Sequence, residues 1–150
     1  MDPNKILTAL IVIGLVVIVL FIVQRIREPY EQIMDQKIDK LKDRISVLFP
    51  DIKNMEIYSG KKSFTIDKKE IYLCLRDEHG EYYEDNMLVY VLLHELAHVH
   101  CHEIGHTDEF YRVFDDILLK AESAGVYTSK IPPIQNYCNH TKEEFRLTKK

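Results

Sequence analysis

Residues 94–110 read HELAHVHCHEIGHTDEF, a stretch that carries five of the seven histidines in this 150-residue chain. His94 and His98 are four residues apart, so a helix places both imidazoles on one face, about one turn apart. At that spacing they can share one tetrahedral Zn²⁺. Glu95 lies about 100° around the helix from His94, so we expect it to be a base and not a ligand. In that role it takes a proton from a zinc-bound water, whose pKa the metal lowers toward about 7.

A catalytic zinc needs a third protein ligand, and His106 is the one that the spacing predicts. His102 would lie about 12 Å along the helix axis from His94, too far for both to reach one ion. His100 points to a different side of the helix. Gly105 permits a turn that other residues resist, and this turn can bring His106 back to the metal.

Several other side chains remain alternatives. Glu122, on the next predicted helix, would offer a carboxylate as the third ligand. Cys101 and Cys138 would offer thiolates, although cysteines without a paired spacing are more often small buried side chains. Tyr127 and Tyr137 are candidate hydrogen-bond donors to an oxyanion, and they are equally well explained as packed aromatic residues.

The residues on both sides of the motif predict the helices of an α+β domain. From about Asn86, apolar residues at helical spacing lead into HELAH, and Gly105 is expected to end that helix. A second helix is expected to begin at the N-cap Thr107 and to end at Gly125. Its apolar face comprises Phe110, Val113, Phe114, Ile117, Leu118 and Ala121.

Upstream, residues 30–49 predict an amphipathic helix with one apolar seam, formed by Met34, Ile38, Leu41, Ile45 and Leu48. We expect it to pack on its own domain, with a homodimer through 30–49 as the alternative. Residues 64–66 and 71–75 then alternate apolar and polar side chains, which predicts an antiparallel hairpin with one buried face.

The N-terminus carries a membrane signal. Residues 6–23 form an uncharged apolar run of 18 residues, which as a helix covers roughly 27 Å, close to the hydrocarbon thickness of a bilayer. No small-residue cleavage site follows, which favours an uncleaved anchor over a signal peptide. Five basic residues follow the run within about 20 positions and only Lys5 precedes it, which predicts a single-pass protein with a cytosolic domain. The three widely spaced cysteines agree with that reducing compartment.

These signals divide the chain into an anchor with its flanks, residues 1–29, and a second domain, residues 30–150, whose catalytic core is expected at 54–138. Without Asp2 and Lys5, residues 24–150 carry 19 basic and 23 acidic side chains. That balance gives no clear nucleic-acid signal. The expected partners are therefore the lipid bilayer, through residues 6–23, and a protein or peptide substrate.

HELAH followed by HTDEFY (His106–Tyr111) resembles the minimal zinc metallopeptidases of the WLM-domain and SprT-like zincin group. The similarity covers residues 64–138: hairpin, zinc helix, third histidine, second helix and a late Tyr-Cys pair. It implies a short antiparallel sheet packed on the HExxH helix, followed by another helix. In zincins of this design the hairpin edge before the zinc helix can hold substrate by strand addition, so the resemblance implies a substrate groove at residues 71–76. It also implies Zn²⁺ ligands and a catalytic glutamate at His94, His98, His106 and Glu95. The combination with an N-terminal anchor looks like predicted metallopeptidases encoded by large DNA viruses.

The expected function is a membrane-anchored zinc metallopeptidase that hydrolyses peptide bonds through a Glu95-activated, zinc-bound water. The alternative is a catalytically inactive, zinc-stabilised interaction module tethered to the membrane. In such a module a protein ligand, often cysteine, closes the fourth metal position. The glutamate beside the first histidine favours the enzyme, because a structural zinc site has no evident use for it.

Overall fold

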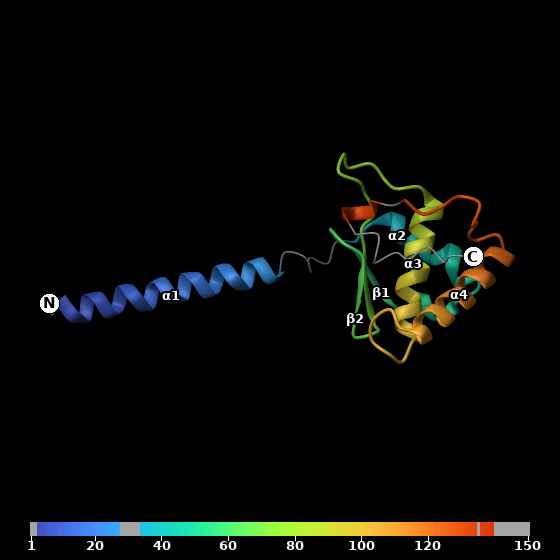
Figure 1. The fold of residues 1–150 in the computed structure, drawn as a ribbon. Helices are drawn as coiled ribbons and strands as arrows, with labels where there is room; N and C mark the ends of the chain where they lie inside the picture. The colour runs from blue at the N-terminus through green and yellow to red at the C-terminus, as the bar shows by residue number, and fades with distance from the viewer. Residues whose placement is uncertain (1–2, 28–33, 135, 140–150) are drawn as a thin grey trace. The chain divides into compact units, whose positions relative to one another are not determined.

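The computed structural model describes residues 3–27, 34–134 and 136–139 of the chain. Contacts within it define two compact units, Met1–Glu31 and Gln32–Lys150. The first unit is built on one helix. The second is an α+β domain in which helices pack on a three-stranded sheet (Figure 1).

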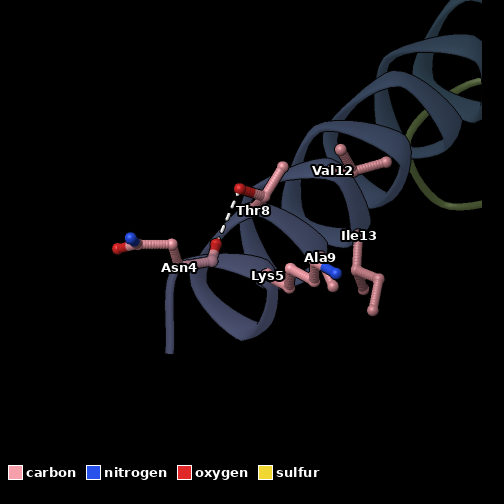
Figure 2. Close-up of a pocket in the computed structure, with 6 residues that line it drawn as sticks. All are labelled: Asn4, Lys5, Thr8, Ala9, Val12 and Ile13. Carbon is pink, nitrogen blue, oxygen red and sulfur yellow. Dashed lines mark hydrogen bonds between the residues drawn. The ribbon is translucent and has the colours of Figure 1, made fainter. Parts of the chain in front are cut away.

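The helix α1 (Pro3–Arg27) is long and apolar enough to cross a membrane. Its span, Asn4–Val23, has a mean hydropathy of 3.5, and none of it is buried inside the structure. A signal sequence near the N-terminus has the same properties. Six residues of this helix line a shallow pocket, and Figure 2 shows two of them joined by a hydrogen bond, which the Thr8 hydroxyl donates to the Asn4 carbonyl at 2.8 Å. This polar side chain is thereby satisfied within the helix, as an apolar solvent requires.

The helix α2 (Gln36–Ser46) begins at Asp35, whose carboxylate accepts a hydrogen bond from the Lys37 amide at 2.8 Å. Three residues of its predicted apolar seam are buried in the core of the same domain: Ile38, Leu41 and Ile45. These three residues therefore pack on their own domain, as the sequence predicts. A 3-10 helix, η2 (Pro50–Asn54), follows. Positions 30–33 of the predicted helix lie outside the described residues.

The sheet contains β1 (Glu56–Ser59), β2 (Phe64–Ile66) and β3 (Glu70–Leu73) in the order β1-β3-β2. β2 and β3 form the predicted antiparallel hairpin, with Thr65 opposite Ile71. β1 pairs with β3 in parallel, so the sheet is mixed and the prediction of an antiparallel sheet is wrong in this respect. β1 has only four residues, too few for its alternation to be recognised in the sequence.

The strand order also changes which strand can accept a substrate. β3 has β1 on one side and β2 on the other, so its backbone groups are already paired. The predicted substrate groove at residues 71–76 is therefore wrong for the part that lies in β3. Of the two edge strands in the described sheet, β2 is the one that packs on the HELAH helix.

That helix is α3 (Asp85–His100), which lies between the sheet and α4 (Asp108–Ser123) in Figure 1. Every residue from Met87 to Ala97 is buried, because neighbouring elements cover the helix on more than one side. It ends at His100 and not at Gly105, since Cys101 already has an extended backbone.

The helix α4 begins and ends where the sequence predicts. The Thr107 hydroxyl caps it by accepting a hydrogen bond from the Phe110 amide at 3.3 Å. Gly125 follows its C-terminus with a φ of 70°, a conformation that glycine adopts without steric cost. Four residues of its apolar face are buried: Phe110, Phe114, Ile117 and Ala121.

Cys74 and Cys138 form a disulfide, and Cys101 is free and buried. The bond joins the end of β3 to η3 (Tyr137–Asn139) across a sequence separation of 64 residues. The pairing differs from the expectation of reduced cysteines, since structural disulfides persist mainly in oxidising compartments. Three cysteines without paired spacing do not reveal which two will meet.

Replacing both Cys74 and Cys138 with serine should lower the free energy of unfolding by about 2–4 kcal/mol, because the bond restricts the unfolded chain. Denaturant titration of the full-length protein with and without reductant measures this. Cys101→Ser is the matched control and should keep the wild-type response to reductant. Equal wild-type stability under both conditions would contradict the prediction.

Candidate metal centre

Three imidazoles converge beside the C-terminal half of α3. His94 and His98 project from α3, whereas His106 comes from the loop between α3 and α4. The Nε2 atom of His106 lies 3.0 Å from that of His94 and 3.1 Å from that of His98. All three ligand atoms lie within 4.8 Å of one another. Nitrogens this close fit one ion bound at about 2.0–2.1 Å from each of them.

The loop geometry explains how His106 reaches its partners. Gly105 has a φ of 88°, which an L side chain rarely adopts, so the chain can reverse immediately before His106. Thr107 then starts α4. The His106 imidazole therefore lies between a tight turn at Gly105 and the capped start of α4. The sequence predicts this turn at Gly105 as the feature that brings His106 back to the other two histidines.

Phe110, one turn into α4, contacts all three imidazoles. Its ring centroid lies 4.9 Å from that of His94, 4.3 Å from that of His98 and 4.7 Å from that of His106. The side chain is completely buried. A buried ring against each imidazole limits the rotamers that they can adopt, so the ligands are partly oriented before any ion binds. From the sequence Phe110 is predicted only as a core residue.

The protonation state of His98 suits a metal ligand. Burial, together with repulsion from His106, lowers the pKa of His98 to about 4. The His98 imidazole is therefore neutral at pH 7, as a metal ligand must be. Three imidazole nitrogens form a donor set that suits Zn²⁺ and other late first-row divalent ions.

Glu95, on α3 beside His94, is 3% exposed. Burial raises its pKa to about 8, and the hydrogen bond from Thr65 opposes that shift. A divalent cation at the three histidines would favour the charged carboxylate and lower this pKa. The environment can therefore hold a carboxylate that readily accepts a proton.

Thr65 contacts the candidate base Glu95, and the sequence does not predict this contact. Its hydroxyl donates a hydrogen bond to Glu95 Oε2 at 2.8 Å, across from β2 to α3. One oxygen of the carboxylate is thereby occupied and the other is left for a further partner. Nothing in the sequence around this threonine, which lies in a strand of three residues, indicates that it will contact Glu95.

A cavity of about 640 Å³ opens in front of these residues. The edge strand β2 lines it on one side, and the loop with Ile104 and His106 lines it on another. Glu95 and the imidazoles of His94 and His98 also reach it. The candidate ligands, the glutamate and the edge strand β2 therefore share one open space.

Two alternative histidines are engaged elsewhere. His100 Nε2 lies 3.2 Å from a carboxylate oxygen of Asp51. His102 Nδ1 lies 3.0 Å from Glu109 Oε1. Neither belongs to the cluster of possible metal ligands among the described residues.

The carboxylate and thiol alternatives are also engaged. Glu122 Oε1 accepts hydrogen bonds from the Ser129 amide at 2.9 Å and from its hydroxyl at 2.5 Å. Cys138 is held in the disulfide, and the Cys101 thiol donates to Glu109 at 3.4 Å. No thiol or further carboxylate joins the three-histidine cluster in the part of the chain that the structure describes.

The two tyrosines considered for an oxyanion are both buried. The Tyr137 hydroxyl hydrogen-bonds to the Cys74 carbonyl and lies 2.9 Å from Ser63 Oγ. The Tyr127 ring packs against Tyr90, with centroids 5.9 Å apart. The packed-aromatic explanation therefore accounts for both.

The chain is similar to three viral proteins. It is 37% identical over 124 residues to uncharacterized protein 136R of Invertebrate iridescent virus 6, covering 67% of this chain and 70% of that protein. It is 44% identical over 87 residues to uncharacterized protein 042R of Invertebrate iridescent virus 3, covering 57% and 55%. It is 49% identical over 70 residues to uncharacterized protein R325 of Acanthamoeba polyphaga mimivirus, covering 42% and 36%. No protein-family model and no solved structure matches the chain.

His106→Ala should weaken zinc binding by at least about 10-fold, because two imidazoles remain where three converge. Competition of the full-length protein with a chromophoric zinc chelator measures the change in Kd. His100→Ala is the matched control and should bind zinc like the wild type. Equal affinity in the two variants would remove His106 from the metal centre.

Proposed function

The chain belongs to the family of uncharacterized protein 136R of Invertebrate iridescent virus 6, and we propose that it is a membrane-anchored, zinc-dependent metallopeptidase. The observation that carries the proposal is the convergence of three imidazoles beside a buried glutamate in an open cavity. The metallopeptidases that it resembles are those of the WLM and SprT-like zincin group. A Zn²⁺ held by His94, His98 and His106 would polarise the scissile carbonyl and lower the pKa of the attacking water.

Glu95 is the proposed general base. Its Oε2 atom accepts the Thr65 hydrogen bond, so Oε1 is the oxygen that can accept a proton from the attacking water. The same carboxyl group can then return the proton to the leaving amine. Thr65 fixes the orientation of the carboxylate, which would otherwise rotate about its side-chain bonds.

The proposed substrate is a peptide or protein segment in an extended conformation. β2 is an edge strand, so backbone groups on its open side can pair with an added strand. β2 contributes Phe64 and Thr65 to the cavity that contains the imidazoles. A peptide paired with this edge would therefore pass beside Glu95 and the bound metal.

The alternative, an inactive zinc-stabilised module, requires a ligand that closes the fourth metal position. Cys138 is bonded to Cys74, and Cys101 is hydrogen-bonded to Glu109. Neither sulfur is available in this arrangement. The donor set of three histidines with an adjacent carboxylate is that of a catalytic site, which supports the enzyme.

Two features give opposite indications of the side of the membrane on which the second domain lies. The basic residues after α1 predict a cytosolic domain. The disulfide favours an oxidising compartment. We give more weight to the disulfide, because it is part of the folded domain whereas the charge rule is a statistical bias, and we propose that the anchored domain faces the oxidising side.

This orientation predicts glycosylation at the Asn139-His140-Thr141 acceptor when the full-length chain is expressed in eukaryotic cells. A mobility shift removed by an N-glycosidase measures it. Thr141→Ala removes the acceptor and should abolish the shift, whereas Thr141→Ser retains it. A chain without the shift, whose domain is digested by protease added to intact vesicles, would place the domain in the cytosol.

Glu95→Gln tests the reaction itself. It should lower peptide hydrolysis by about 10²–10⁴-fold, because the amide accepts no proton, while the zinc content stays unchanged. A quenched-peptide library measures cleavage by the full-length protein in detergent, and elemental analysis measures zinc. Glu81→Gln, at an exposed loop position, is the control. Undiminished cleavage by the Glu95 variant would overturn the proposed function.

A further inference from the structure

Two charged side chains bind the backbone of the segment Cys101–Glu103, which leads from α3 toward His106. Lys68, in the turn between β2 and β3, donates from Nζ to the Cys101 carbonyl at 2.6 Å and to the His102 carbonyl at 3.1 Å. The ammonium group of Lys68 thus binds the carbonyl oxygens of two successive residues just after the end of α3. Hydrogen bonds with an ionised partner are roughly twice as strong as neutral ones.

Glu109, in the first turn of α4, binds the donors of the same segment. Its carboxylate accepts from the Glu103 amide at 3.0 Å and from the His102 amide at 3.4 Å. It also lies 3.0 Å from His102 Nδ1 and accepts from the Cys101 thiol at 3.4 Å. The hydrogen bonds from His102 and Glu103 hold the pKa of Glu109 at about 2, so the group is an anion at neutral pH.

We infer that Lys68 and Glu109 form a backbone clamp that positions His106 for zinc, an inference that rests on the proposed metal centre. The clamp fixes one end of the loop, and the Thr107 cap fixes the other. Only Ile104 and Gly105 lie between the clamped segment and His106. An imidazole on so short a tether has few alternative positions, so metal binding does not have to order it.

The Lys68 backbone agrees with a defined role for this side chain. Lys68 has a φ of 58° and the preceding Asp67 a φ of 47°, values uncommon in residues other than glycine. This left-handed turn is the one from which the ammonium group reaches the carbonyls of the other loop. The turn of the hairpin and the metal-binding loop are thereby joined, although 33 residues separate Lys68 from Cys101.

A simpler explanation for Glu109 is stabilisation of α4, since an anion near a helix N-terminus is favourable. Asp108 supplies an anion in the same turn and is exposed. Asp108→Ala therefore removes the same helix-dipole contribution and leaves the clamp intact. Lys69 offers the same kind of control for Lys68, because it is an exposed lysine of the same turn.

The experiment measures the zinc affinity of the full-length protein in detergent by competition with a chromophoric chelator. Glu109→Ala and Lys68→Met should each weaken zinc binding by about 10–100-fold, as loss of groups that orient metal ligands does. Asp108→Ala and Lys69→Met should bind like the wild type. Lys68→Arg keeps a cationic donor and should restore most of the affinity. The Cys74/Cys138 serine variant, a destabilised protein with the clamp intact, should also retain it.

Wild-type affinity in both Glu109→Ala and Lys68→Met would overturn the clamp. Equal weakening in the Asp108 and Lys69 controls would overturn it as well, because the effect would then be one of charge or helix stability. If Glu109→Ala does not fold, the difference in zinc affinity between Lys68→Met and Lys68→Arg is enough to test the clamp. A wild-type protein that binds no zinc would instead refute the proposed function.

Discussion

The site depends on one packing constraint, the burial of α3 between the sheet and α4. Because α3 is covered on more than one side, the side chains of His94 and Glu95 cannot turn away to solvent. The four-residue spacing then sets His94 and His98 on one face by helix geometry alone. Everything that completes the site comes from neighbouring elements that pack on this helix.

Those elements contribute by different kinds of interaction. α4 supplies Phe110, an apolar ring that touches all three imidazoles, and β2 supplies Thr65, a single hydrogen-bond donor to Glu95. Packing restricts the neutral rings, whereas a directed hydrogen bond orients the carboxylate. Burial alone would favour the protonated form of Glu95, so the Thr65 bond and a nearby cation act in the opposite direction to burial.

The parts predictable from sequence are those that follow from local periodicity. Helix spacing gives His94 and His98, the Thr107 cap gives the start of α4, and alternation gives the β2–β3 hairpin. Contacts between distant segments leave no local pattern. The parallel pairing of β1, the Cys74–Cys138 bond and the Thr65 contact with Glu95 are all of this kind. The end of α3 is missed for the same reason, because the carbonyls there are bound by Lys68 from another element.

The Cys74–Cys138 disulfide supports the strand β2 that lies beside the three histidines. β2 is a three-residue edge strand paired with β3, which is a short pairing for the strand proposed to receive a substrate. Ser63, immediately before β2, accepts a hydrogen bond from the Cys74 amide and pairs with the buried Tyr137 hydroxyl. Tyr137 is adjacent to Cys138, so the cross-link fixes the residue that supports the start of β2. The covalent bond thus stabilises the edge strand from its buried side, while Thr65 joins the strand to the helix that carries Glu95.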